Sequence, residues 1–362
     1  MIDRVDLAPG YSVSRLINGG WQLSEGHHEG GFDRQSVLGG LWELVESGLT
    51  TFDCADIYTG VEELLGELVR TMDGQGKVQI HTKYVPDLTD LPTVTRRDVE
   101  ATIDRSLHRL GVERLDLVQF HWWDYEVPRY VEVAGWLAEL QRAGKIRLIG
   151  TTNFDVARLN EIIDAGVPVV ANQLQYSLFD RRAEGGMVSF CQKHDLDLLC
   201  YGSLAGGFLS SFWVGQPEPG AQLANRSLTK YKLIIDEFGG WALYQEILGV
   251  LSKIAHRHQV SPANIATRWV LDRPGVAAVL VGARSTTHLQ DNLRVFGLEL
   301  GEEDYQLLDG VLSRASGPIG QPFELERVPG GRHSTIMKTD LNRGSSGLVG
   351  SEVDPRGAER GS

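Results

Sequence analysis

The segment that begins with VQIHTK (residues 78–83) and ends with LDLVQFH (residues 115–121) decides the fold. Both ends are short runs rich in Val, Ile and Leu, which is typical of strands buried on both faces of a parallel sheet. Between them, Val99, Ile103 and Leu107 recur every fourth residue, as in a helix that buries one stripe and exposes the other. The segment therefore predicts a strand–helix–strand unit.

The same alternation recurs along most of the chain. Further short apolar runs make eight in all, and they lie at residues 16–17, 50–53, 146–151, 168–173, 196–201 and 276–282. Eight strand–helix repeats predict an α/β protein with a (β/α)8 barrel, or TIM barrel. The alternative is a doubly wound sheet that binds a dinucleotide. It would have GxGxxG after the first strand, where this chain has INGGWQ (residues 17–22).

The domain organisation follows from where this pattern stops. We expect residues 1–315 to form the barrel and residues 316–362 to form a flexible tail, because residues 341–362 are rich in Gly, Ser, Arg and Glu. A long loop, about residues 202–240, follows the seventh strand. Such a loop leaves the carboxyl end of a barrel, where active sites lie, so it is a candidate lid or a surface decoration.

Charge and composition exclude several classes of function. The chain has 35 Lys and Arg against 48 Asp and Glu, a net charge of −13, which argues against nucleic acid or an anionic membrane as the main partner. No apolar stretch approaches the roughly 18 residues that span a bilayer. The N-terminus lacks the apolar core of a signal peptide, and the three cysteines are widely spaced, so we expect a cytoplasmic protein. The oligomeric state stays open.

Four polar residues lie at or just after the ends of consecutive predicted strands: Asp53, Tyr58, Lys83 and His121. A lysine ammonium at roughly 4 Å from a phenol attracts the phenolate by about 4 kcal/mol at an intermediate dielectric. An aspartate would keep that lysine charged, and a histidine would orient a carbonyl group. Tyr58 would then donate a proton to the carbonyl oxygen while another group delivers hydride, and no metal is needed.

Two other kinds of enzyme are alternatives. A metal-dependent barrel hydrolase would use Asp53, His81 and His121, although such a site usually has more His and carboxylate ligands than this chain offers. A short-chain dehydrogenase is disfavoured, because neither its glycine motif nor a tyrosine four residues before a lysine occurs.

These segments together resemble the aldo-keto reductase superfamily. The aspartate-to-tyrosine segment is TFDCADIY (51–58), and the lysine and histidine lie in IHTK (80–83) and LDLVQFH (115–121). Further similar segments are GTTNF (150–154), NQLQYS (172–177), YGSLAGG (201–207), GARS (282–285) and LQDNL (289–293). The chain departs from the family at Gly202 and Ser203, where serine and proline are usual, and at Asp291, where glutamate is common.

The resemblance implies an NADPH-dependent oxidoreductase that reduces an aldehyde or ketone to an alcohol, with Tyr58 as the proton donor. Arg284 would hold the 2′-phosphate, because a guanidinium binds phosphate through two parallel hydrogen bonds. The alternative is a non-catalytic NADP-binding barrel that regulates a partner protein. The implied cofactor-binding residues are Trp21, Thr152, Asn153, Gln173, Tyr201, Gly202, Ser203, Leu204, Gly206, Gly282, Arg284, Gln290 and Asn292. Trp21, Trp122 and Trp123 lie at the ends of predicted strands one and four, so we expect them to bind substrate; the equal alternative is that Trp122 or Trp123 packs beneath the lid loop. No metal ligands are expected.

Overall fold

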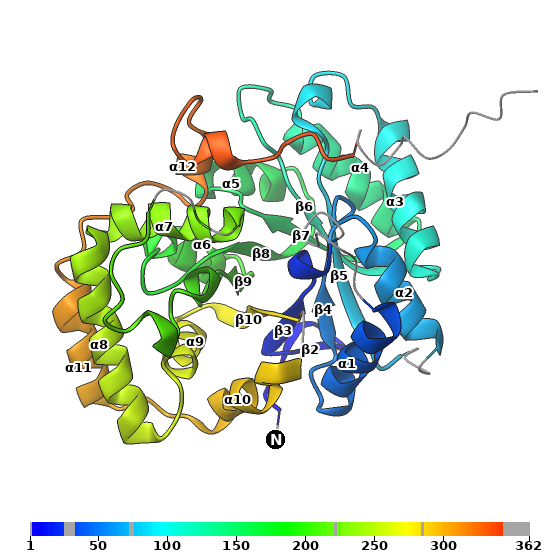
Figure 1. The fold of residues 1–362 in the computed structure, drawn as a ribbon. Coiled ribbons are helices and arrows are strands. Elements are labelled where there is room, and N and C mark those ends of the chain that lie inside the picture. Colours follow the sequence, from blue (N-terminus) through cyan, green and yellow to red (C-terminus); the bar gives the residue numbers. More distant parts are fainter. Residues whose placement is uncertain are drawn as a thin grey trace, which may run out of the picture.

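A closed barrel of parallel strands forms the centre of the molecule (Figure 1). The computed structural model describes residues 2–24, 33–71, 76–220, 223, 225–283 and 286–342. Around the barrel the strands follow one another in chain order, and β10 closes onto β3. The predicted (β/α)8 barrel is confirmed. Its strands are β3 (Leu16–Gly19), β4 (Thr51–Asp53), β5 (Gln79–Tyr84), β6 (Leu115–Phe120), β7 (Ile146–Thr152), β8 (Val169–Gln175), β9 (Asp197–Tyr201) and β10 (Val276–Gly282).

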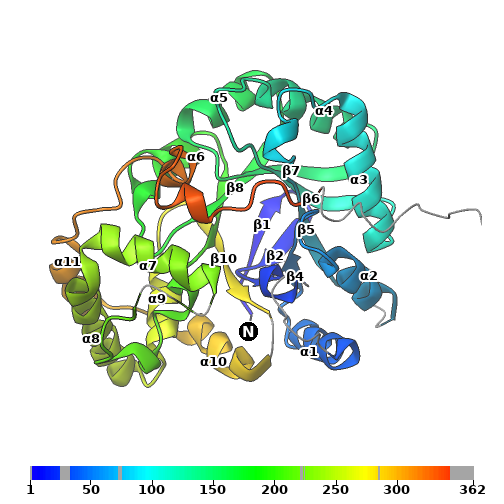
Figure 2. The same ribbon diagram turned by 45° about the horizontal axis from the view of Figure 1, so that its top comes forward.

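Helices surround the barrel (Figures 1 and 2). Their apolar side chains are buried in the core between helices and strands. In α3, Val99 and Ile103 are buried as the spacing predicts, a Thr95–Asp98 capping box starts the helix, and Gly111 ends it at φ 67°. No helix of the described ranges is long and apolar enough to cross a lipid bilayer. Helix α3 spans Arg96–Leu110. Apart from α7, which is described below, the other helices before residue 316 are α1 (Arg34–Glu46), α2 (Val61–Thr71), α4 (Tyr130–Arg142), α5 (Val156–Asp164), α6 (Met187–Lys193), α8 (Gly240–His258), α9 (Pro262–Leu271), α10 (Leu289–Leu293) and α11 (Glu302–Leu312).

An antiparallel hairpin that the sequence analysis did not predict precedes the barrel. Its strands are β1 (Arg4–Ala8) and β2 (Tyr11–Ser14). Its buried side chains join the inward-facing residues of the barrel strands in a separate apolar cluster, which includes Leu7, Tyr11, Val13, Ile17 and Leu117. The hairpin therefore packs against the end at which the strands begin, opposite the end that carries the polar residues.

The connection after β9 is not a loop throughout. Its second half is a helix, α7 (Arg226–Phe238), which Asn225 caps by accepting a hydrogen bond from the Leu228 amide at 2.9 Å. Tyr231 and Phe238 on this helix are buried. A long connection at this position was predicted, but the helix within it was not.

The prediction of a flexible segment from residue 316 onward differs from the structure. Residues 316–342 cross the carboxyl end of the barrel and include the short helix α12 (Glu324–Arg327) (Figure 1). Asn342 donates from its side-chain amide to the Val85 carbonyl at 2.9 Å, and Asp340 accepts from Thr89 at 2.7 Å. Polar contacts hold this segment, and an argument from apolar composition does not detect them. Residues 343–362 lie outside the described residues.

The contact between α2 and α3 gives a stability prediction. A Cβ added at Gly66 would lie 2.5 Å from the Arg109 carbonyl oxygen, whereas one added at Gly39 on α1 would meet nothing within 4 Å. We expect Gly66→Ala to lower the free energy of unfolding by about 1–3 kcal/mol through overpacking. Gly39→Ala is the control and should raise that free energy by about 0.5–1 kcal/mol. Urea unfolding of both variants checks this, and equal effects would contradict it.

Candidate active site

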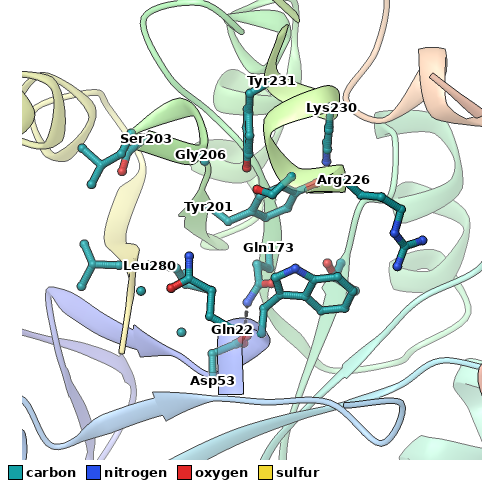
Figure 3. A pocket seen from close by; sticks show the side chains of 18 of the residues that line it. Gln22, Asp53, Gln173, Tyr201, Ser203, Gly206, Arg226, Lys230, Tyr231 and Leu280 are labelled. Atoms are coloured by element: carbon teal, nitrogen blue, oxygen red, sulfur yellow. Dashed lines mark hydrogen bonds between the residues drawn. The ribbon is translucent and has the colours of Figure 1, made fainter. Parts of the chain in front are cut away.

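The four predicted catalytic residues meet in one cavity of about 640 Å³ at the carboxyl end of the barrel. Asp53 ends β4, Tyr58 lies in the loop that follows, Lys83 lies on β5, and His121 follows β6. Neighbouring parallel strands end at the same edge, so these residues converge although they are up to 68 positions apart (121 − 53) in the sequence. Figure 3 shows Asp53 at the base of this cavity, below Gln173 and Tyr201.

Asp53 accepts the hydrogen bonds that organise the base of the site. One carboxylate oxygen accepts from Lys83 Nζ at 2.5 Å, and the other accepts from the side-chain amides of Gln119 at 2.8 Å and Gln173 at 2.7 Å. Burial lowers the pKa of Lys83, but the Asp53 carboxylate outweighs burial and holds the pKa above its usual value. Lys83 therefore remains an ammonium. Sequence reasoning missed Gln119, although strand alternation places it on the same face as His121.

Tyr58 packs against Lys83, and its phenol is protonated. The Lys83 ammonium lies 5.1 Å from the centre of the phenol ring, and Trp21 packs edge-on at 4.9 Å. Burial raises the pKa of Tyr58 to about 12 although the Lys83 charge lowers it. The sequence argument considered the charge of Lys83 but not the burial of the Tyr58 phenol. It therefore implied a lowered pKa for Tyr58 instead of a raised one. Tyr58 is consequently protonated at neutral pH.

His121 is neutral, and the position of its proton is defined. Its Nδ1 lies 3.1 Å from the Thr152 carbonyl oxygen, which can only accept, so Nδ1 carries the proton. Burial, and next the charge of Arg327, lowers the pKa of His121 to about 3. The Nε2 atom is buried, has no hydrogen-bond partner among the described residues, and belongs to a residue that lines the cavity. Nε2 is therefore a hydrogen-bond acceptor that can orient a group bearing a hydrogen, and it cannot donate to a carbonyl oxygen.

Most of the predicted cofactor-binding residues line the same cavity. Tyr201 donates its hydroxyl hydrogen to Asn153 Oδ1 at 2.8 Å, which fixes the phenol ring. Gln290 is exposed on α10 and does not line the cavity, which differs from the prediction, because its neighbours Asp291 and Asn292 face inward instead. Arg284 lies outside the described residues. The predicted cofactor-binding residues that do line the cavity are Trp21, Thr152, Asn153, Gln173, Tyr201, Gly202, Ser203, Leu204, Gly206, Gly282 and Asn292.

The wall beyond Tyr201 fits the phosphates of a nucleotide cofactor. The Ser203 hydroxyl is buried in this wall and, in the part of the chain that the structure describes, has no hydrogen-bond partner. Gly202 and Gly206 have φ angles of 78° and 64°, and a Cβ at either would lie 2.6 Å from Tyr231 of α7. These glycines thus allow the helix to close over the loop, with Ser203 and Leu280 on one side and Arg226 and Lys230 on the other (Figure 3).

The three tryptophans predicted to bind substrate do not all face the cavity. Trp21, which is 36% exposed, and Trp123 line it. Trp122 is fully buried among the core aromatics and donates from Nε1 to the Val127 carbonyl at 3.0 Å, so its predicted role is wrong. Phe323, from the segment after the barrel, takes a place in the wall instead, and no sequence pattern indicates it.

The side chains of the hydrolase alternative do not form a ligand set. Both oxygens of Asp53 already accept hydrogen bonds from Lys83, Gln119 and Gln173. Across the ranges that the structure describes, no three His, Cys, Asp or Glu residues come close enough to hold a metal ion.

Comparison with known proteins assigns the family. The model of the Aldo/keto reductase family matches residues 15–313, and the chain belongs to this family. Membership makes the protein an oxidoreductase that uses a nicotinamide cofactor and acts on small carbonyl compounds.

Three similar proteins illustrate the range of the family. The chain is 29% identical to the aldo-keto reductase YhdN of Bacillus subtilis over 87% of this chain and 95% of that protein. It is 29% identical to flagellar radial spoke protein 5 of Chlamydomonas reinhardtii over 64% of this chain, and it spans only 56% of that longer protein. The solved structure of the thermostable aldo-keto reductase Tm1743 with the inhibitor epalrestat superposes with a TM-score of 0.67 at 27% identity, covering 86% of this chain and all of that one.

Proposed function

We propose that the protein reduces an aldehyde or ketone to an alcohol with NADPH, and that Tyr58 is the proton donor. The observation that carries this proposal is the cavity that holds a protonated Tyr58 beside a lysine ammonium, with His121 and Tyr201 on its walls. A bound nicotinamide would supply the hydride. The substrate is a small molecule.

The chain's own residues would act in the following way. The Tyr58 hydroxyl donates its proton to the carbonyl oxygen, and the Lys83 ammonium stabilises the phenolate that remains. Asp53 keeps Lys83 charged and oriented. The hydroxyl of the new alcohol donates to His121 Nε2, because that atom is an acceptor. Trp21 and Trp123 limit the access of water to the reacting atoms.

The assay that tests this function follows the loss of reduced-nicotinamide absorbance with a panel of aldehydes, ketones and quinones. Turnover of at least one substrate supports the proposal. Tight NADP binding without any turnover would favour the alternative, a regulatory barrel, for which the similarity to a radial spoke protein is a reason. A cytoplasmic location stays a prediction.

Arg284 carries the choice of NADPH over NADH. We expect Arg284→Ala to raise the Kd for NADPH by about 10- to 100-fold, because one charge-assisted phosphate contact contributes about 1.5–3 kcal/mol. The Kd for NADH should stay within a factor of about two, because NADH has no 2′-phosphate for this contact. Fluorescence titration with both cofactors measures this. An equal loss of affinity for both would remove the argument for NADPH.

A further inference from the structure

Arg327 on α12 holds two loops of the active site together through their main chains. Its Nη2 donates to the Trp122 carbonyl at 2.9 Å and to the Asn153 carbonyl at 3.0 Å. Its Nε donates to the Trp123 carbonyl at 3.2 Å. One guanidinium thus contacts the chain immediately after His121 and the chain immediately after Thr152.

The same two loops are joined by His121 itself. Its Nδ1 donates to the Thr152 carbonyl at 3.1 Å, so the imidazole and the guanidinium form two parallel links between the ends of β6 and β7. The rings of Trp123 and Phe323 stand edge-on to the imidazole at 4.3 Å and 5.4 Å. Phe323 also lies one helical turn from Arg327 and 5.0 Å from its guanidinium. The segment after the barrel therefore supports the imidazole on one side.

Arg327 is partly buried, and two carboxylates, Asp155 and Glu326, act on its charge from a distance. Among the described residues no carboxylate forms an ion pair with Arg327, and its other close neighbour is the ring of Tyr125 at 4.2 Å. The planar guanidinium offers several donors in a fixed arrangement and so bonds three carbonyls of the two loops at once, whereas a lysine ammonium has no such fork. A structural anchor alone would not need its charge placed beside His121.

We infer that Arg327 is a positioning residue for His121, which sets the orientation of the imidazole and keeps Nε2 a hydrogen-bond acceptor. This inference rests on the proposed function of His121 in binding the alcohol hydroxyl. Two cations face the imidazole, Arg327 from α12 and Lys83 from β5, and the Thr152 carbonyl faces it from β7. Lys83 is paired directly with Asp53, whereas Arg327 forms no ion pair within the described residues and its charge is offset only by the more distant Asp155 and Glu326, so Arg327 opposes a second proton on the ring.

Two substitutions separate position from charge. Arg327→Lys keeps the positive charge but loses the fork, and Arg327→Met loses both. In each we expect kcat to fall by about 10- to 100-fold, because small displacements of a reacting group have effects of this size. The Kd for NADPH should not change. In Arg327→Met alone, the pKa of His121 should rise, so that the acid limb of the kcat profile moves to higher pH.

The control is Asp340→Ala, which releases the same segment from Thr89 without touching His121. This variant should keep the kcat of the parent. The pKa and tautomer of His121 are read independently of turnover by 15N NMR of histidine-labelled protein, with the resonance assigned from His121→Asn. An inactive parent protein whose His121 resonance still shifts in Arg327→Met would contradict the proposed function and not this inference. Unchanged kcat and an unchanged resonance in folded Arg327 variants, or an equal loss in Asp340→Ala, would overturn the inference.

Discussion

Tyr58→Phe should lower kcat for carbonyl reduction by about 10²- to 10⁴-fold, the usual contribution of a positioned general acid. The substitution keeps the ring that packs against Trp21 and removes only the hydroxyl, so the Kd for NADPH should not change. Because the pKa of Tyr58 is raised to about 12, its hydroxyl stays protonated as the pH rises through the ordinary tyrosine value of about 10. The parent enzyme should therefore show no loss of kcat from ionisation of Tyr58 as the pH rises to about 10.

The matched control is Tyr84→Phe. Tyr84 is the next residue after Lys83 on β5, is buried, and does not line the cavity. Removing its hydroxyl should leave kcat within a factor of about two, because the proton donor is untouched. Steady-state assays of both variants with one substrate decide the matter, and full activity of Tyr58→Phe would exclude it as the proton donor.

Lys83→Met should have the largest effect on stability, together with loss of activity. It leaves the Asp53 carboxylate buried with only amide partners, and breaking a buried ion pair from one side costs about 3–5 kcal/mol. The phenolate of Tyr58 would also lose its stabilising charge, so kcat should fall with the stability. Chemical unfolding and assays below the unfolding transition separate the two losses.

A double variant tests the cause of this instability. In Lys83→Met with Asp53→Asn the buried charge is gone, and the Asn oxygen can still accept from Gln173. We expect the double variant to recover at least about 1–2 kcal/mol relative to Lys83→Met, while activity stays lost. A double variant no more stable than Lys83→Met would mean that lost packing, and not the unpaired carboxylate, causes the damage.

The barrel could be predicted because its strands repeat one pattern. Runs such as residues 115–121 are apolar on both faces, and the polar residue at each end is then placed at one edge by geometry alone. This brought Asp53, Tyr58, Lys83 and His121 together correctly. Beyond the last residue of a strand the alternation has no meaning, so Trp122 and Trp123 could not be told apart.

Other parts of the site could not be predicted for physical reasons. The protonation of Tyr58 depends on how much water surrounds it, and a residue order does not give that. The hydrogen bonds of Arg327 to Trp122, Trp123 and Asn153 are made with main-chain carbonyls, which leave no pattern in the side chains around them. The hairpin before β3 and the helix α7 lie outside the repeat on which the fold prediction rested.

The main-chain contacts of Arg327 have an evolutionary consequence. Every type of amino acid has the same main-chain carbonyl oxygen. Residues 122, 123 and 153 can therefore be exchanged without removing an acceptor of Arg327. The two loops, which contribute Trp123 and Asn153 to the cavity wall, are thus free to diverge while their attachment persists. Selection for a new substrate can therefore change the side chains of the cavity wall while the hydrogen bonds of Arg327 to these loops are kept.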